Sequence, residues 1–330
     1  PAVNNSPQDH FNTKLYTGNG STNNITGVGF QPDFVWIKSR SEAYWHRAFD
    51  VLRGATKQLY PNDSAAEATE STSLTAFGSD GFTLGGFQYT NNNTTNFASW
   101  NWKAGGSGVS NSDGTISSTV SANTDAGFSI VSWTGNSQLN DQVGHGLDEA
   151  PDLVIYKSRG ATGDWYVITT AIDGSYDYLK LNGTQVASAQ NGVTISSSTI
   201  PNYNYGSTVI AYCFHSVEGF SKFGSYTGNG SDDGPFIYTG FRPAFVMWKN
   251  VGANENWYIV DTARDPHNES YHLLRPDAPN AEASGTVDGI DLLSNGFKLK
   301  VAGGGWINAS GNTFLYMAFA EMPFKYANAR

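Results

Sequence analysis

The chain has little of what builds disulfide frameworks, zinc clusters or membrane spans. Its 330 residues include one cysteine, Cys213, which excludes a disulfide within the chain and makes a zinc cluster unexpected. No apolar run reaches the roughly 18 residues of a transmembrane helix. Residues 1–10 are polar and lack the apolar segment of a secretory signal. We therefore expect no membrane insertion, and a chain that matures in a cytoplasm or has lost a leader.

Charge is also scarce. Charged residues make up 15% of the chain, against about a quarter in typical domains, so Asn, Ser, Thr and Gly must supply much of the polar surface. The formal net charge is -10, and an acidic chain is repelled by phosphate backbones and anionic bilayers. Nucleic acid is therefore not an expected partner. Aromatic residues make up 14%, which is enough to fill packed cores.

Three anchor sequences recur in the same order and indicate three copies of one structural module. The opening anchor resembles YTGNG, the second resembles PDFVWIKSR and is followed by a tryptophan, and the third is an aromatic closing segment. The spacing from the opening aromatic residue to the proline is 16, 18 and 17 positions, and from that proline to the tryptophan 13, 14 and 14. The anchors lie at residues 16–20, 133–137 and 226–230; at 32–40, 151–159 and 243–250; and at 97–103, 209–215 and 315–321.

These copies predict the domain organisation. We expect an N-terminal arm at residues 1–10, followed by β modules at 11–106, 127–218 and 219–330. Residues 107–126 are rich in Gly, Ser and Asn and are predicted to be a flexible linker, in which 116–120 has the pattern of a short strand. Almost no linker separates the second and third modules, so these two should dock rigidly.

The hydrophobic pattern predicts strands. Residues 34–37 (FVWI) are apolar throughout, as in a strand covered on both faces. Residues 297–301 (FKLKV) alternate, as in a strand with one wet face. Asx-Gly turn signals occupy matching places in the three copies. The predicted fold is all-β, with three tandem β-sandwich modules of the concanavalin-like jelly-roll type and the closing strand beside the strand at residue 34. At most one helical turn is expected in each of 63–71 and 279–283.

Several of these sequences resemble a domain of unknown function found in structural proteins of marine tailed bacteriophages. The resemblance is carried by YTGNG, GFQPDFVWIKSR, RGATKQLY, SDGFTLG and WNWKAG in the first copy, and by IDLLSNGFKL and MAFAEMPFKYANAR near the end. It covers nearly the whole chain after His10. The second copy departs from it, because residues 172–176 (IDGSY) replace RGATK.

The resemblance implies a place on a particle. We expect a virion surface protein, assembled in the host cytoplasm and belonging to a tail fibre or head fibre, with other capsid or tail proteins as partners. Contact with host surface polysaccharide is expected, as is a homo-oligomer, with a trimer favoured. The alternative is a capsid decoration or cement protein with a structural role. A polysaccharide depolymerase is the third reading, and no enzyme is expected because the sequence shows no nucleophile elbow, P-loop or dinucleotide fingerprint.

Two groups of polar residues were weighed as sites. Residues 111–114 (NSDG) and 231–234 (SDDG) offer oxygen ligands for calcium, but turn formation by Asx-Gly explains both more simply. Asp261 and Asp265 flank Arg264, and Asp50 precedes Arg53. A glycosidase needs two carboxylates in one groove, whereas a structural ion pair that braces a loop is the simpler interpretation. No catalytic residue, metal or cofactor is predicted.

Aromatic residues divide into core anchors and loop residues. Trp45, Trp165 and Trp257 follow the second anchors and are predicted to be equivalent sandwich-core anchors. Loop aromatics among Asn and Gly suit stacking on sugars, because a ring face and polar groups lie together. The glycan-binding candidates are Tyr89, Tyr203, Tyr205 and Trp306.

Overall fold

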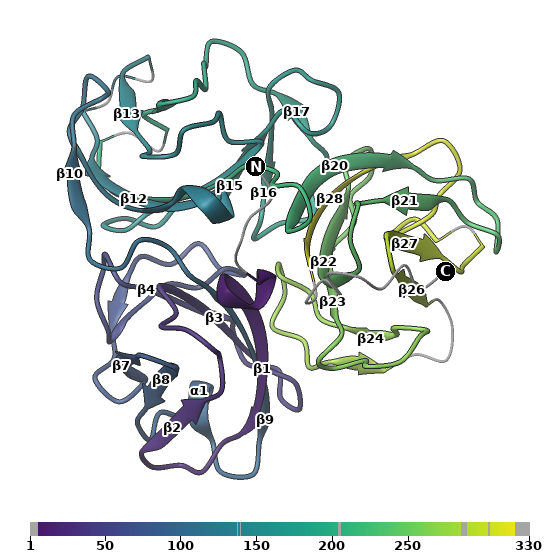
Figure 1. Ribbon diagram of the computed structural model, residues 1–330, viewed down its shortest axis with the longest axis horizontal. Coiled ribbons are helices and arrows are strands. Elements are labelled where there is room, and N and C mark those ends of the chain that lie inside the picture. Colours follow the sequence, from purple (N-terminus) through teal and green to yellow (C-terminus); the bar gives the residue numbers. More distant parts are fainter. Residues whose placement is uncertain are drawn as a thin grey trace.

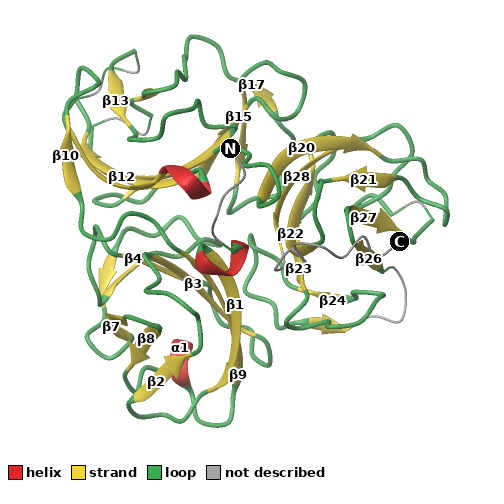
Figure 2. Cartoon of the chain, viewed as in Figure 1, coloured by secondary structure: helices red, strands yellow, loops and turns green. Residues whose placement is uncertain are grey.

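The computed structural model describes residues 6–136, 138, 140–203, 206–284, 289–302 and 304–320. This part of the chain forms three β-rich lobes around a common centre, as Figure 1 shows in a view down the shortest axis. Strands dominate (Figure 2), which confirms the all-β prediction. The helices of the described residues are α1 (Gln88–Asn91) and the 3-10 turns η1 (Pro7–Asp9) and η2 (Thr124–Ala126). Among the described residues, no helix is long and apolar enough to cross a bilayer.

The first lobe is a sandwich of two antiparallel sheets. Its main sheet has the order β1-β9-β3-β4, its smaller sheet the order β2-β8-β7, and β5 pairs with β6. The strands are β1 (Phe11–Thr17), β2 (Asn23–Thr26), β3 (Phe34–Ser39), β4 (Arg47–Asp50), β5 (Lys57–Gln58), β6 (Ala68–Thr69), β7 (Leu74–Gly78), β8 (Gly81–Leu84) and β9 (Asn96–Trp102).

The second lobe has one large sheet and one small sheet. The large sheet has the order β10-β11-β12-β19-β14-β15-β16-β17, and β13 pairs with β18. The strands are β10 (Val109–Asn111), β11 (Ser118–Asn123), β12 (Phe128–Thr134), β13 (Gln142–Gly144), β14 (Leu153–Ser158), β15 (Tyr166–Thr169), β16 (Asp177–Lys180), β17 (Ser188–Ala189), β18 (Thr199–Pro201) and β19 (Thr208–Phe214).

The third lobe repeats the plan of the first. The orders are β20-β28-β22-β23 and β21-β27-β26, and β24 pairs with β25. The strands are β20 (Ser221–Thr227), β21 (Phe236–Tyr238), β22 (Pro243–Asn250), β23 (Trp257–Asp261), β24 (His272–Leu273), β25 (Ala283–Ser284), β26 (Ile290–Leu293), β27 (Gly296–Leu299) and β28 (Thr313–Ala320).

One strand order recurs in the three main sheets. In each, the opening strand pairs with the closing strand, which pairs with the second-anchor strand, which pairs with the strand that follows it. The predicted place of the closing strand is therefore confirmed. The register defines equivalent positions in the three modules. The assignment to a concanavalin-like jelly roll stays a prediction. Equivalent cross-strand pairs are Trp36–Trp100, Ile155–Tyr212 and Met247–Met317.

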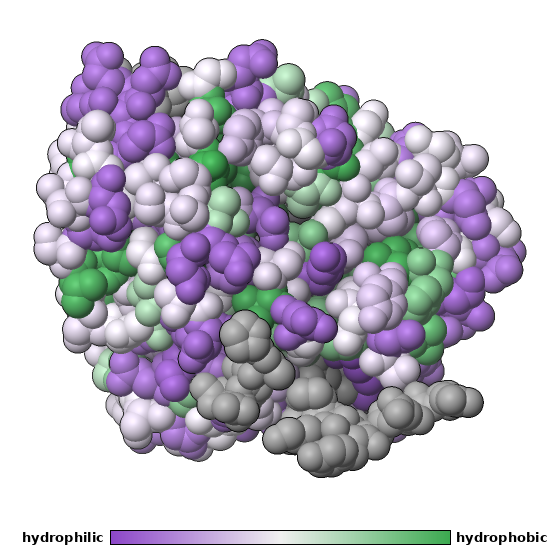
Figure 3. Space-filling view, turned by 45° about the horizontal axis from the view of Figure 1, so that its top comes forward, coloured by the Kyte–Doolittle hydropathy of each residue, from purple (hydrophilic) through white to green (hydrophobic). Residues whose placement is uncertain are grey.

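The three main sheets pack against one another at the centre of the molecule. One cluster of buried side chains takes members from all three modules, among them Trp100, Tyr212 and Met317. The opposite face of each main sheet packs within its own sandwich, in three separate clusters. The main-sheet strands are therefore covered on both faces, which explains why residues 34–37 are apolar throughout. On the face shown in Figure 3, hydrophobic residues appear in small separate groups.

Hydrogen bonds close a ring around this centre. Trp165 Nε1 of the second module donates to the carbonyl of Tyr60 in the first at 2.7 Å. Trp257 Nε1 of the third module donates to the carbonyl of Lys180 in the second at 2.9 Å. In the first module the equivalent residue is His46, whose Nε2 lies 2.9 Å from the carbonyl of Arg275 in the third. Each module thus contacts the next, and the relation is that of a pseudo-threefold axis.

The prediction of three equivalent sandwich-core tryptophans is therefore wrong in two respects. Trp165 and Trp257 are buried between modules, in the shared central cluster. Trp45 is 42% exposed and precedes the true counterpart, His46, by one position. The register fixes this counterpart, because Arg47, Tyr166 and Tyr258 hold matching places opposite the second-anchor strands.

Buried ion pairs brace two of the three module boundaries. Between the first and second modules, Asp50 pairs with Arg53 at 2.5 Å and accepts a 2.7 Å hydrogen bond from Tyr212. Burial opposes the charge on Arg53, but Asp50 raises its pKa above the ordinary value. Between the third and first modules, Asp261 pairs with Arg264 at 2.6 Å and accepts from Trp100 Nε1 at 3.0 Å.

The boundary between the second and third modules replaces this network by apolar residues. The register places Thr169 where the aspartates stand, three residues before Ile172, and places Met317 where Tyr212 and Trp100 stand. The backbone N–H of Ala187 donates to the carbonyl of Val251. At the other two boundaries the equivalent backbone hydrogen bond runs from a glutamate to an arginine. The exchange is concerted, since keeping one charged member alone would leave it buried and unpaired. The corresponding ion pairs are Glu67–Arg159 and Glu282–Arg40.

The segments that carry these glutamates contain no helical turn. Glu67 and Glu282 donate their backbone N–H groups to the carbonyls of Arg159 and Arg40, at 2.9 and 2.8 Å. Residues 63–71 contain the short strand β6, and β25 begins at residue 283, so neither segment forms the one helical turn that the sequence allows. Contacts with the neighbouring module outweigh the helix propensity of the alanines.

The linker prediction is also wrong for most of residues 107–126. β10 and β11 extend the large sheet of the second module, Val120 is buried, and Ser118 Oγ donates to the carbonyl of Gly144 at 2.7 Å. The composition is polar because these strands lie at the edge of the sheet, where alternate side chains face solvent.

The predicted N-terminal arm is part of the body from Ser6 onward. Pro7 and His10 are buried, and the His10 ring lies 5.8 Å from the ring of Phe220 in the third module. Residues 1–5 lie outside the described part of the chain.

Candidate ligand-binding site

The predicted loop aromatics lie in the same connection of each module, Tyr203 and Trp306 in loops and Tyr89 in the short helix α1. Tyr89, Tyr203 and Trp306 follow β8, β18 and β27, and precede β9, β19 and β28, which are equivalent strands in the three modules. The structure therefore places one sequence candidate in the corresponding connection of each module. Tyr89 and Trp306 lie two residues before the buried asparagine of that connection, and Tyr203 directly follows it. Tyr205, the fourth candidate, lies outside the described residues.

A buried asparagine holds each of these loops. Asn91, Asn202 and Asn308 are fully buried beside the candidates. Their Nδ2 atoms donate to the side-chain oxygens of the opening-anchor asparagines at 3.1, 2.9 and 3.2 Å, and these partners are Asn19, Asn136 and Asn229. The recurring TGN sequence of the opening anchors is thus the latch for the loop that carries the aromatic residue.

The glycine of the opening anchor permits this close approach. A Cβ atom on Gly18 would lie 2.1 Å from the carbonyl oxygen of Asn92, and one on Gly228 would lie 2.3 Å from that of Ala309. Real Cβ atoms do not come so close to backbone, so a larger residue would push the loop away.

Each loop aromatic packs on the same register position of the strand after the second anchor. Tyr203 lies 5.0 Å from Tyr166 and Trp306 lies 5.1 Å from Tyr258, measured between ring centroids. Tyr89 lies 5.1 Å from the guanidinium carbon of Arg47. The three loop aromatics are half-buried, so each offers part of a ring at the surface while its neighbour fixes its position.

Polar groups complete these sites. Tyr203 Oη donates to the side-chain oxygen of Gln190 at 3.0 Å, and the carbonyl of Trp306 accepts from Trp248 Nε1 at 3.0 Å. A partly exposed ring beside fixed polar groups is suited to stacking on the apolar face of a sugar.

The first site differs from the others by a buried charge that the sequence reasoning missed. Arg47 stands where the other modules have Tyr166 and Tyr258, and it is 4% exposed. Its guanidinium lies over the rings of Tyr60 and Tyr89. The signal in the sequence was the alignment of residue 47 with two tyrosines, which only the strand register makes visible.

The carboxylates weighed for glycoside hydrolysis serve the module boundaries. Asp50 and Asp261 are fully buried against arginines. Asp265 accepts hydrogen bonds from the backbone N–H groups of Tyr271 and His272 and contacts the His272 ring. These carboxylates brace loops and interfaces, as the simpler interpretation of the sequence held.

The segments weighed for calcium form turns. Asp113 donates its N–H to Asn111 Oδ1 at 2.9 Å, and Asp233 pairs with Lys298 at 2.7 Å. In the described ranges, no group of three or more His, Cys, Asp or Glu side chains is placed to hold a metal ion.

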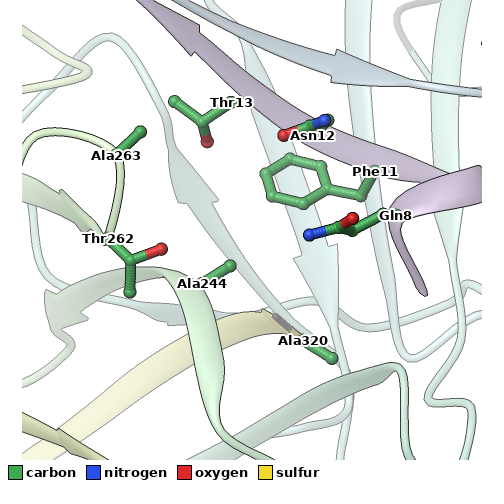
Figure 4. Close-up of a pocket in the computed structure, with 8 residues that line it drawn as sticks. All are labelled: Gln8, Phe11, Asn12, Thr13, Ala244, Thr262, Ala263 and Ala320. Carbon is green, nitrogen blue, oxygen red and sulfur yellow. The ribbon is translucent and has the colours of Figure 1, made fainter. Parts of the chain in front are cut away.

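A small pocket lies between the first and third modules (Figure 4). Its volume is about 200 Å³, and its polar side chains are uncharged. It offers hydrogen bonds but no acid or base for catalysis. The lining residues are Gln8, Phe11, Asn12, Thr13, Ala244, Thr262, Ala263 and Ala320.

The fold and the repeated loop sites define an all-β protein of three sandwich-like modules with one latched aromatic loop in each. By comparison with family profiles, the chain belongs to the domain of unknown function DUF7483, which matches residues 6–323. No match was found among curated proteins or among solved structures.

Proposed function

We propose that the chain is a non-catalytic glycan-binding protein of the virion surface, carried on a tail fibre or head fibre. One observation supports binding above all. Half-buried aromatic residues occupy equivalent latched loops in all three modules, although the loops themselves differ in sequence. A purely structural loop has no need to present a ring at the surface in every copy.

Repetition gives such weak sites a use. One stacked sugar contributes little affinity, but linked sites that bind together gain about 10²–10⁴ in avidity. Three linked sites suit a surface covered with repeated polysaccharide units. A homo-trimer of the chain, which we also propose, would increase the number of sites further.

The place on a virion rests on the resemblance of the anchor sequences to phage structural proteins. Capsid or tail proteins are the proposed partners, host surface polysaccharide is the proposed ligand, and assembly takes place in the host cytoplasm. No metal or cofactor is proposed for binding.

A capsid decoration protein is the second candidate. The observation that favours it is the pseudo-threefold body, which is shortest along the direction viewed in Figure 1 and is held by one core shared among the modules. Such a body matches a local threefold position on a shell. Particles without the protein should then burst more easily and adsorb normally.

The test is a glycan array probed with the purified chain. We expect Tyr203→Ala and Trp306→Ala each to weaken binding to the same glycans. The matched control is Tyr238→Ala, because Tyr238 is 66% exposed and lies outside the three loops. Binding that the loop variants leave unchanged would refute the site, and sugar release by the wild-type chain would refute the non-catalytic assignment.

A further inference from the structure

Arg47 carries a buried charge, and no carboxylate of the described residues forms an ion pair with it. Its Nη1 donates to the carbonyls of Trp45 and His46 at 2.9 and 3.1 Å, and its Nε has no partner among the described residues. The other two fully buried guanidinium groups, of Arg53 and Arg264, each pair with an aspartate. A buried cation without a counter-ion is costly, and burial lowers the pKa of Arg47 to about 10.

Aromatic rings pack against this guanidinium. Its carbon lies 4.6 Å from the ring centroid of Tyr60 and 5.1 Å from that of Tyr89. Tyr44 packs against Tyr89 at 5.0 Å, and Trp45 packs against Tyr60 at 5.6 Å. Tyr44 and Tyr89 are half-buried and Trp45 is 42% exposed, so an open aromatic surface adjoins the charge.

In the second and third sites, a carboxylate balances the charge of the nearby cationic side chain. In the second module Lys180 pairs with Asp164 at 2.7 Å. In the third, the half-buried Arg275 lies 5.7 Å from the ring of Tyr258 and interacts with Asp277. In the first module Asn62 stands where the third module has Asp277, and Trp45 stands where the second has Asp164. Asp63 favours the charged form of Arg47. The missing counter-charge is therefore specific to the first site.

We propose that the first site binds the carboxylate of an acidic sugar, with Arg47 as the counter-charge and Tyr89 and Trp45 as the stacking surface. This assignment rests on the proposed glycan binding and adds the class of sugar. A carboxylate supplies the missing partner of the guanidinium, and charge-assisted hydrogen bonds are the strong ones. The net charge of -10 does not oppose it at contact, because solvent-exposed charges are screened beyond about 8 Å at physiological salt.

The experiment compares three probes by calorimetry: tetragalacturonate, its methyl ester as the neutral counterpart, and a sulfated tetrasaccharide. The wild-type chain should bind tetragalacturonate at least about tenfold more tightly than the ester, as one charge-assisted hydrogen bond implies. Arg47→Tyr, which installs the residue of the other two modules, should abolish this preference and keep the binding of the ester. Arg47→Lys, which keeps the charge, should retain part of the preference, and near-ultraviolet circular dichroism checks that both variants are folded.

Equal binding of acid and ester by the wild-type chain, with Trp306→Ala still weakening both, would overturn the Arg47 assignment alone. Tighter binding of the sulfated probe would overturn the choice of a carboxylate. Binding of none of the three probes would overturn this assignment. Glycan-array binding that Trp306→Ala leaves unchanged would overturn the proposed glycan binding as well.

Discussion

The interchange of a buried ion-pair network with apolar residues can be tested at the boundary of the first and second modules. The side chains of Asp50 and Arg53 are both fully buried, so Asp50→Thr leaves a buried guanidinium and an unpaired Tyr212 hydroxyl. Breaking a buried pair on one side costs about 3–5 kcal/mol. The free energy of unfolding should fall by that amount.

The third boundary supplies the compensated replacement. Asp50→Thr, Arg53→Ile and Tyr212→Met together copy the residues found between the second and third modules. Glu67 keeps its 3.0 Å ion pair with Arg159 in this variant. Because no charge is left unpaired, the triple variant should lie within about 2 kcal/mol of the wild-type chain and above the single variant.

Equilibrium denaturation in guanidinium chloride measures both variants, with fluorescence and circular dichroism as parallel probes. Coincident transitions are expected, because the modules share one core. A triple variant no more stable than Asp50→Thr would refute the equivalence of the three boundaries.

Three further predictions concern packing and pH. Trp257→Ala should cost about 3–5 kcal/mol and Trp45→Ala less than about 1 kcal/mol in the same denaturation assay; similar costs would contradict the corrected register. Burial lowers the pKa of His46 well below its ordinary value, so the folded state binds its proton less readily than the unfolded state. The contribution of neutral His46 to the free energy of unfolding should be complete above about pH 6.5. It should be lost as the pH falls below that value, by up to about 1.4 kcal/mol per pH unit. His46→Trp should remove this part of the pH dependence. If the free energy of unfolding of the variant falls with pH as steeply as that of the wild-type chain, the prediction for His46 is wrong. Limited proteolysis should spare residues 109–123, since they are strands of the large sheet; early cleavage there would restore the linker interpretation.

The sequence predicted that the closing strand lies beside the second-anchor strand, because these are the most apolar segments of each copy and central strands are buried. The opening, second and closing anchors form the adjoining strands of each main sheet. It could not predict how the modules meet, because apolar strands do not reveal what covers their second face. The spacing of 13 rather than 14 positions before Trp45 was the one sign that this tryptophan is out of register, and position 14 is His46.

The loop aromatics were found from composition, but their equivalence was not. The segments between the last two strands of each module differ in length and sequence. Only the strand register shows that Tyr89, Tyr203 and Trp306 pack on equivalent residues. The charge on Arg47 was missed for the same reason. Its role depends on the absence of a neighbouring carboxylate, and contacts between distant residues are not legible in a single sequence.

The central claim is that three equivalent loop sites bind glycan together. The most direct measurement compares the affinity of the chain for a glycan displayed densely on a surface with its affinity for the same glycan free in solution. The wild-type chain should gain about 10²–10⁴ on the dense surface, and the gain should shrink stepwise as Tyr89, Tyr203 and Trp306 are changed to alanine in turn. A gain that persists in the triple variant, or no gain for the wild-type chain, would contradict the account.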